Sequence, residues 1–510
     1  MSRFRLVPRI EQSGTLRVAV TTVPGKLVLL FITWLMLQAH GVPVPRAVAL
    51  ALVPITLFPR WRRPLLLVAT LGFWLIGFNW LDWRLVDHSL AIAGLNLNLA
   101  IGMERAVPIA IAMLLCAAVV HLFTRSRWAD KVGMPFYWLL AFYVGLVGIF
   151  STGWLSESAR AIFWAVSVPF GGMIWFLGYT LIERKKPGLP GFWGQVGHYI
   201  PFWAHDSEIP MGKGASYLQR IEAKTPEALA ISHLKGIKLI YWALLLHILH
   251  TALTGILYGR GSMGDLVLLR NNADLLFYWR GELYIRFGGI PDWLWMPRFR
   301  AAFDACMRGA CYGWLINWQA LISFFFDDLL RAAIWMHVTI GTLRIAGFNA
   351  LRGMRNPLAA SSIADFWNRV DYYFKEMLVH LFYFPVFFRY LRRWRYLRMF
   401  ASVFAAVFIG NSLLHFLMYQ RVIMERGIWA ALQGFHGYAI YAFILANGIF
   451  FSQWLLDRHS PLRGYLQHRI LAPLRVSTFY CLILVFAYTR MDSNIVDNLR
   501  FFCSLFGISL

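Results

Sequence analysis

Long apolar blocks constrain what this chain can fold into more than any other feature of its sequence. The stretch 65–78 is apolar on nearly every face, whereas a half-buried strand would alternate apolar and polar positions. Hydrophobic residues make up 59% of the 510 residues and charged residues 15%, which is unusual for a soluble domain. Because backbone polar groups in lipid must pair within their own segment, such blocks predict membrane-spanning helices. The lack of alternation excludes an outer-membrane barrel.

About eleven segments are apolar over a length that can cross about 30 Å of hydrocarbon. They begin near Leu27, Val44, Pro64, Val107, Pro135, Ala161, Leu239, Ala310, Leu397, Ala431 and Val476. The first two are short and separated only by residues 41–43, so a re-entrant hairpin is an alternative there. The sequence predicts an all-α, polytopic membrane protein with re-entrant or interfacial helices, built as a single integral membrane domain over residues 1–510.

Basic residues are in large excess, with 49 Lys and Arg against 25 Asp and Glu and a net charge of +24. In a soluble protein this excess would suggest a nucleic acid partner. Here the basic residues cluster between apolar blocks, at residues 60–63, 125–131, 184–186 and 392–398. Such clusters fix membrane topology and contact anionic headgroups. We therefore expect membrane lipids and no nucleic acid as partners, with the N-terminus and the first three clusters on the cytoplasmic side.

Cysteine and histidine spacing gives no metal site. The cysteines are Cys116, Cys306, Cys311, Cys481 and Cys503. They contain no CxxC pair, so neither a disulfide scaffold nor a zinc site is indicated, although Cys306 and Cys311 could form one bridge in an extracytoplasmic loop. His247 and His250 share one helix face but have no third ligand of matching depth.

Two long polar connections interrupt the apolar pattern. Residues 183–237 are too polar to span and are predicted to pack at the cytoplasmic surface, while residues 259–309 alternate aromatic and charged side chains, which favours short interfacial helices. The stretch 310–348 exceeds one membrane thickness and contains Asp327 and Asp328. It is either one long tilted helix or two short helices broken at a solvated hinge, and a proton or ion relay at the aspartates is a further alternative.

Residues 361–390 are too charged for a plain span and too aromatic for a loop. In a helix, one apolar stripe would comprise Phe366, Val370, Phe374 and Met377. The polar residues would project toward other faces: Asp365, Asn368, Arg369 and Asp371. This pattern predicts a half-membrane helix that lines a water-accessible cavity.

Residues 361–420 resemble the motif-bearing core of the membrane-bound O-acyltransferase (MBOAT) family, in its bacterial branch. The run Asp-Phe-Trp-Asn-Arg-Val-Asp at 365–371 is similar to the opening of the family motif, and Leu-Phe-Tyr-Phe-Pro at 381–385 is similar to its end. His415 follows Asp371 by 44 residues, inside a run that resembles the small-residue stretch before the family's catalytic histidine. Asn368 and Val370 differ from the residues most common there, and Asp371 stands where many bacterial relatives carry His or Asn.

The resemblance implies an MBOAT-like fold and transfer of an acyl group from a cytoplasmic thioester, acyl-CoA or an acyl carrier protein, to a hydroxyl. The acceptor would be a membrane-accessible or exported molecule such as a cell-envelope glycan or a lipid, with a periplasmic partner protein in some bacterial members. The resemblance also implies the bacterial cytoplasmic (inner) membrane as the location and no permanently bound cofactor. It assigns catalysis to His415 and Asp371. It assigns substrate binding to Asp365, Trp367, Asn368, Arg369 and Asn411.

The chemistry explains why a histidine and a carboxyl group would be needed. Attack of a hydroxyl on a thioester requires a base, and neutral imidazole, with a pKa near about 6.5, can act as one without an uncompensated charge in the membrane. A nearby polar group could orient the imidazole or hold the donor. Structural alternatives stay open: His415 as a packing residue, Asp371 as a helix cap or as the partner of Arg369 or Lys375, and Asp365 as a cap.

Two other functions also fit a basic multi-pass protein. A transporter or export channel would use intramembrane His, Asp and Arg residues, but it predicts related halves, and the sequence has no such internal symmetry. A lipid-linked glycan ligase would place its essential Arg and His residues in the extracytoplasmic connection 259–309.

Overall fold

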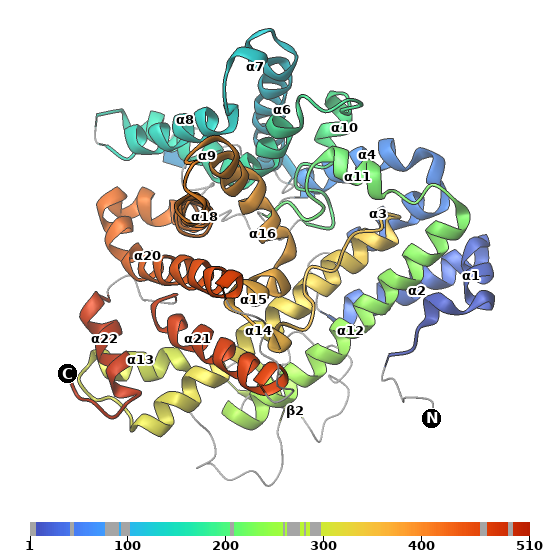
Figure 1. Cartoon of the computed structure of the whole chain (residues 1–510). Helices are drawn as coiled ribbons and strands as arrows, with labels where there is room; N and C mark the ends of the chain where they lie inside the picture. The colour runs from blue at the N-terminus through green and yellow to red at the C-terminus, as the bar shows by residue number, and fades with distance from the viewer. Residues whose placement is uncertain are drawn as a thin grey trace.

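The computed structural model describes most of the chain. The described residues are 7–40, 45–76, 91–92, 103–152, 154–204, 209–258, 261–262, 276–279, 282–285, 297–458, 467–487 and 493–510. Their regular structure is helical, apart from one small three-stranded antiparallel sheet (Figure 1). The predicted all-α class is therefore correct for the main body of the protein.

The helices follow one another with short connections over most of the chain (Figure 1). The first group is α1 (Gly14–Thr21), α2 (Val23–Ala39), α3 (Pro45–Leu57), α4 (Arg62–Ile76), α6 (Met103–Arg125), α7 (Trp128–Lys131), α8 (Pro135–Phe150) and α9 (Glu157–Glu183). The middle group is α10 (Phe192–Val196), α11 (Ala215–Ile221), α12 (Pro226–Tyr258), α13 (Phe299–Met307) and α14 (Trp314–Ile345). The last group is α15 (Ile363–Val370), α16 (Tyr372–Leu378), α17 (Phe384–Arg389), α18 (Arg395–Val403), α19 (Asn411–Leu417), α20 (Gln420–Arg458), α21 (Ala472–Ala487) and α22 (Ile495–Ser504).

Five helices are long and apolar enough to cross a membrane. They cover Val107–Arg125, Pro226–Gly255, Arg395–Leu417, Gln420–Leu455 and Arg469–Ala487. The number rises to seven if each of two bent pairs is one span, namely α1 with α2, bent by 99°, and the two halves of α9, bent by 49°. The chain is therefore a multi-pass helical membrane protein, as its apolar blocks predict.

The predicted number of about eleven spans is not reached within the described residues. Arg46–Leu57 and Pro135–Phe150 are apolar but shorter than the roughly twenty residues that a span requires. α14 is long enough, yet Asp327, Asp328 and Arg331 make its middle too polar for a segment that faces lipid. Apolar blocks in the sequence thus overestimate the spans, because some of them form helices that are too short or too polar to cross the membrane.

α14 has no break at its aspartates and runs over 32 residues. Asp327 is held on both carboxylate oxygens, by His250 Nε2 of α12 at 2.6 Å and by Arg331 Nη2 at 2.9 Å. Both partners lie on the helix surfaces that meet there, so the carboxylate is satisfied without opening the helix to water. The predicted hinge is therefore wrong, and the alternative of one long helix is confirmed.

We expect Asp327→Ala to lower the free energy of unfolding by about 1–2 kcal/mol, because it leaves His250 and Arg331 without their shared acceptor. The loss stays in this range because Arg331 is half exposed to solvent. Thermal unfolding of the detergent-purified chain measures the change. Glu425→Ala is the matched control, because it removes only the exposed ion pair with Arg421 and should cost less than about 0.5 kcal/mol. Equal losses in the two variants would contradict the prediction.

The two histidines considered as metal ligands have different partners. His247 stacks on His40, the residue that follows α2, with ring centroids 5.6 Å apart, while His250 bonds Asp327. In the part of the chain that the structure describes, no group of three His, Cys, Asp or Glu side chains could hold a metal ion.

α12 and α14 pack closely because glycines face each other at their crossing. A Cβ atom added to Gly236 would lie 2.7 Å from the carbonyl oxygen of Gly341, and one added to Gly341 would lie 3.0 Å from the oxygen of Gly236 and 2.5 Å from Ile240 Cγ1. Ser232 Oγ also donates to the Arg344 carbonyl across this contact, at 2.8 Å. Small residues at the interface let the two backbones approach, as is common in membrane helices.

We expect Gly341→Ala to destabilise the protein by about 1–3 kcal/mol, since the added methyl group meets backbone and cannot be absorbed by a side-chain movement. The midpoint of thermal unfolding is the measurement. Gly145→Ala in α8 is the control, because nothing lies within 4 Å of its added Cβ atom and that variant should be neutral or slightly stabilising.

The connection 259–309 contains strands where interfacial helices were predicted. β1 (Gly261–Ser262), β2 (Leu276–Trp279) and β3 (Glu282–Ile285) form a sheet in the order β1-β3-β2. β2 and β3 pair antiparallel, with Trp279 opposite Glu282. The aromatic residues of β2 and β3 favour strands over a helix, which explains the difference. The same connection also contains a short helix, α13, as predicted, and its remaining residues up to 296 lie outside the described residues.

The connection 183–237 packs partly into the interior of the protein. Tyr199, Phe202 and Trp203 are fully or almost fully buried. Trp74 Nε1 of α4 donates to the Tyr199 carbonyl at 3.2 Å, and Thr70 Oγ1 donates to Gly197 at 2.9 Å. Its aromatic residues fill the space next to α4, and its location on the cytoplasmic side of the membrane stays a prediction.

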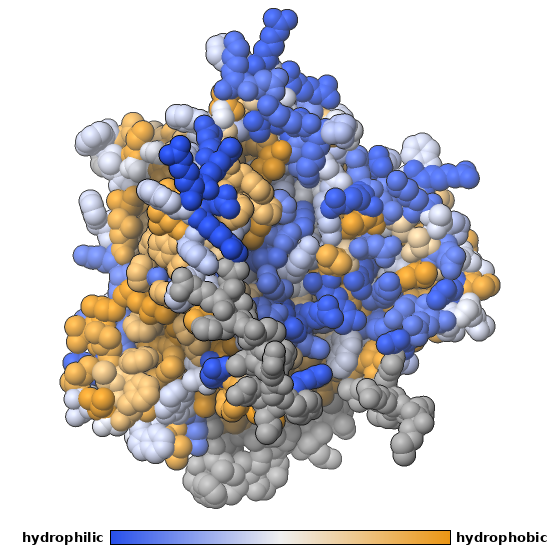
Figure 2. Space-filling model, viewed as in Figure 1, coloured by the Kyte–Doolittle hydropathy of each residue, from blue (hydrophilic) through white to orange (hydrophobic). Residues whose placement is uncertain are grey.

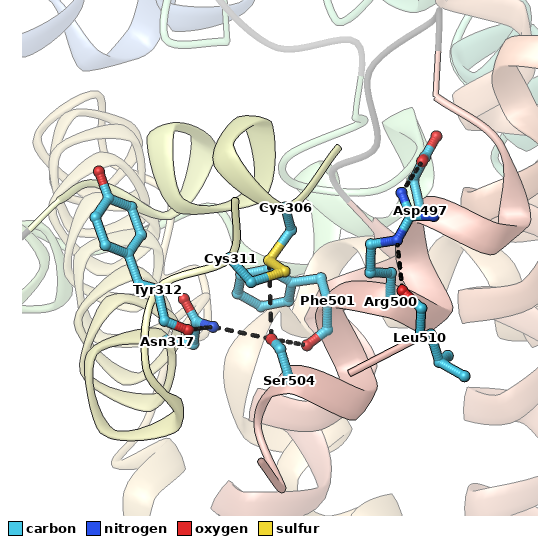
Figure 3. Close-up of a disulfide and its surroundings, with 9 residues drawn as sticks. All are labelled: Cys306, Cys311, Tyr312, Asn317, Asp497, Arg500, Phe501, Ser504 and Leu510. Carbon is cyan, nitrogen blue, oxygen red and sulfur yellow. Dashed lines mark hydrogen bonds and ion pairs between the residues drawn. A yellow bond between two sulfur atoms is a disulfide. The ribbon is translucent and has the colours of Figure 1, made fainter. Parts of the chain in front are cut away.

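The corner formed by α13, α14 and α22 holds a disulfide between Cys306 and Cys311 (Figure 3). Asn317 Nδ2 donates to Ser504 Oγ at 2.9 Å, which ties α14 to α22 beside the bridge (Figure 3). This single bridge is the alternative that the sequence left open, and it closes the turn before α14.

Figure 2 shows that apolar surface gathers at the lower left over α20, α22 and α13, while hydrophilic surface gathers over α6 and α7 at the top.

Candidate functional site

A cavity of about 490 Å³ lies where α14, α15, α19, α20 and α21 meet. Most of its wall is aliphatic or aromatic. The polar side chains on it are Asp328, Asp371, Asn411, His415, Tyr419, Tyr438, Tyr441 and Tyr480. An apolar cavity with a few convergent polar groups is the usual form of a small-molecule site.

A π-helical turn sets the position of α19. The chain continues from α18 through a π-helical segment, Phe404–Gly410, into Asn411–Leu417 without leaving the helix. Gly410 packs directly on the Phe382 ring, which lies in a second π-helical segment, Val379–Tyr383, and a Cβ atom on this glycine would come within 2.6 Å of the ring. A π-turn shifts the register of the following residues around the helix axis and is frequent at functional sites. Here it turns Asn411 and His415 toward the cavity wall.

His415 is held in one tautomer and one orientation. Its Nδ1 lies 2.9 Å from the Asn411 carbonyl oxygen. A carbonyl can only accept, so Nδ1 carries the proton and Nε2 keeps a lone pair. The ring stacks on Tyr438 at 4.3 Å between centroids and meets the edge of Phe374 at 5.9 Å. The imidazole is therefore arranged as a neutral base.

Asn411 and Tyr438 hold the His415 ring in this orientation. Tyr438 Oη donates to Asn411 Oδ1 at 3.0 Å, and Asn411 is buried, with 1% of its surface exposed. The same tyrosine thus stacks on His415 and bonds the residue whose carbonyl holds it. The three side chains form one unit across α19 and α20.

Asp371 lies at a break between α15 and α16, neither of which is among the helices that could span the membrane. Its backbone leaves the helical region there, and its Oδ1 accepts from the Phe374 amide at 2.9 Å, so it caps α16. Burial raises the pKa of this carboxyl to about 7, although the Phe374 and Tyr373 amides act in the opposite direction. The predicted single helix over this segment is two short helices, because the aspartate caps the second one.

Four of the predicted site residues lie on the cavity: His415, Asp371, Asn411 and Trp367. The other three do not. Asn368 faces a neighbouring cavity of about 170 Å³ that Trp367 also lines. Asp365 and Arg369 pair with each other at 2.8 Å, and both are partly exposed.

Of the structural roles considered for the acidic residues, the helix cap is confirmed for Asp371, which caps α16. Ser362 caps α15, and Asp365 sits in its first turn, where it accepts from the Ser361 amide at 3.0 Å. Arg369 is bound to Asp365 and Lys375 to Glu376, so Asp371 has neither of its expected basic partners.

Several tyrosines and Asp328 line the cavity without any sequence signal that marks them as site residues. Tyr438 and Tyr441 lie in α20 and Tyr480 in α21, where no local pattern separates them from ordinary core aromatics. Asp328 was noted only as a charge in a predicted helix break, yet it faces the cavity from α14. Only spatial convergence identifies these residues.

No known family model matches this chain, and no curated protein matches it. The geometry by itself describes a mostly apolar chamber with a neutral imidazole and a carboxyl group of raised pKa in its wall.

Proposed function

We propose that the chain is an O-acyltransferase that moves an acyl group from a thioester, acyl-CoA or an acyl carrier protein, to a hydroxyl of a membrane-accessible or exported acceptor such as a cell-envelope glycan. One observation carries the proposal: His415 and Asp371, from separate segments, line the same cavity. The resemblance of residues 361–420 to the MBOAT motif supports the same pair. On this proposal the site lies in a bacterial cytoplasmic membrane and serves an exported product.

The reaction would use the lone pair on His415 Nε2. This nitrogen takes the proton of the acceptor hydroxyl while the oxygen forms a bond to the thioester carbonyl carbon. The tetrahedral intermediate then expels the thiolate as the carbon–sulfur bond breaks, and the imidazolium returns the proton to the sulfur. No charge remains on the imidazole at the end, as an apolar chamber requires.

Asp371 would act in its protonated form. With a pKa of about 7, its carboxyl group is partly neutral near pH 7 and can donate a hydrogen bond to the oxygen that gains negative charge in the intermediate. It does not orient His415, because the Asn411 carbonyl already occupies Nδ1. His415 is thus the base, and Asp371 is the hydrogen-bond donor to the oxygen that gains negative charge.

The direct test is thioester consumption by the full-length chain in lipid nanodiscs. Radiolabelled acyl-CoA of several chain lengths is supplied with a hydroxyl acceptor, and release of free thiol and labelled ester are both followed. We expect release above the rate of heat-denatured protein. No release with any donor, together with proton-coupled solute uptake into vesicles, would replace the proposal with a transporter, for which the His250–Asp327 pair would be a candidate proton site. A glycan ligase would depend on the connection 259–309, most of which lies outside the described residues.

A further inference from the structure

A second polar cavity, of about 550 Å³, lies away from the candidate site and shares no lining residue with it. It is formed by the C-terminal end of α9, the turn that follows it, and α11. Five basic side chains line it: Arg63, Lys186, Lys213, Arg220 and Lys224. Glu183 is the one carboxylate on its wall.

Three of the five basic residues are neutralised by carboxylates. Lys186 bonds Glu183 at 3.0 Å, Lys213 bonds Glu376 at 2.6 Å, and Arg63 bonds Glu222 at 3.1 Å. These pairs anchor the wall without cancelling the charge of the whole cavity.

Arg220 and Lys224 have no salt bridge to any described residue. Arg220 packs over the Tyr217 ring at 5.2 Å, which orients its guanidinium beside the cavity. Figure 2 shows hydrophilic surface over the region where Figure 1 places α10 and α11. An unneutralised Arg and Lys in one hollow attract an anion.

Two buried hydroxyl groups on this cavity also lack partners. Tyr179 Oη and Ser216 Oγ are buried and make no hydrogen bond to the described residues. Tyr179 as a whole is only 3% exposed. A buried hydroxyl without an acceptor costs about 1–3 kcal/mol, so a ligand oxygen at this position would recover that cost.

We propose that this cavity binds a phosphate ester. Its groups are two free cations and two hydroxyl donors, which suit a tetrahedral anion with three free oxygens and a charge of about −1.5 to −2 better than a carboxylate with two oxygens. The proposal stands on residues separate from the acyl-transfer site and holds whether or not the chain transfers acyl groups.

The phosphate could belong to a soluble ester or to an anionic lipid headgroup. An adjoining apolar groove of about 470 Å³ shares Ile182 and His380 with the cavity and carries Arg184, Arg389 and Arg392 on its wall. An acyl chain in this groove would let a phospholipid place its headgroup on Lys224 and Arg220. The shared chemistry is the phosphate, and the experiment separates the two sources.

Inorganic pyrophosphate is the probe for the soluble source, measured by titration calorimetry on the detergent-purified full-length chain. We expect Lys224→Gln and Ser216→Ala each to weaken binding about 5-fold to 10-fold. Lys185→Gln is the matched control: it is exposed, adjacent in sequence to Lys186 and outside the cavity, and its pair with Asp130 is exposed too. Its affinity should equal that of the wild type.

Nanodiscs test the lipid source. The chain is placed in phosphatidylcholine alone or with phosphatidic acid, and the unfolding midpoint is compared. A rise with phosphatidic acid that Lys224→Gln removes, and Lys185→Gln keeps, assigns a lipid headgroup; pyrophosphate binding without that rise assigns a soluble ester. If neither probe binds, or if Lys224→Gln and Lys185→Gln behave alike in both arms, the proposal is overturned. Acyl transfer by the Lys224→Gln protein is measured separately. A failure of phosphate binding can then be distinguished from a failure of the proposed acyl transfer.

Discussion

Replacing His415 with alanine is expected to lower acyl transfer by about 10²-fold to 10⁴-fold, the usual cost of removing a general base. The substitution removes the one imidazole among the described residues that line the cavity. The Asn411 carbonyl holds Nδ1 of this ring, and Tyr438 stacks on the ring. No other lining side chain can take a hydroxyl proton as a neutral base near pH 7. Initial rates of thiol release and ester formation from acyl-CoA measure the effect.

The loss must be separated from a loss of folding. His415→Gln keeps a polar side chain of similar size and should remain as inactive as His415→Ala. His436→Ala is the matched control, because this histidine is in the neighbouring α20 and does not line the cavity. Its transfer rate should stay within about 2-fold of the wild type. Equal rates in wild type and His415→Ala, with equal unfolding midpoints, would refute the assignment of a base.

Replacing Asp371 with asparagine should change the pH dependence of transfer more than its maximal rate. The carboxyl pKa of about 7 implies that wild-type activity falls as the pH rises through 7, since the ionised form cannot donate a hydrogen bond. Asp371→Asn keeps a neutral donor and a good helix cap, so it should hold its rate at pH 6 and lose the decline above pH 7. Asp371→Ala should lose about 10²-fold to 10³-fold at every pH, the typical effect of removing one oxyanion donor.

The same pKa predicts a stability change with a defined sign. The folded-state pKa of about 7 is above the ordinary value of 3.8, so the folded protein binds the extra proton. The contribution of this group to stability is therefore complete below about pH 4 and is lost as the pH rises through 7. Since the side chain faces a cavity, we expect a change of about 2 kcal/mol, absent in Asp371→Asn. An identical pH profile of unfolding in both proteins would show that the carboxyl does not titrate there.

The sequence was informative wherever the physical cause is local. Apolar blocks required helices in lipid, because an unpaired backbone amide cannot be left in hydrocarbon, and the structure has these helices. Polar residues in the segment 361–390 indicated a cavity beside it, and Asp371 and Trp367 line one. The order and spacing of residues 365–371, 381–385 and His415 were also visible without coordinates.

Some structural choices depended on partners far away in the chain. α14 stays continuous through Asp327 because His250, 77 residues earlier, satisfies the carboxylate. The break at Asp371 arises because its side chain caps the next helix, which the apolar stripe over both helices cannot reveal. The number of spans differed because some apolar blocks form short helices, such as α8 with 16 residues, and composition does not show where a helix begins and ends.

The sequence by itself determined that this chain is a helical multi-pass membrane protein and singled out a histidine and an aspartate 44 residues apart. Only the tertiary structure decided that both side chains border one cavity, that Tyr438 stacks on the histidine, and that Asp365 and Arg369 bond each other away from it. The reason is physical. Hydrophobicity and helix formation act between near neighbours in the chain, whereas a site requires packing that brings distant segments together.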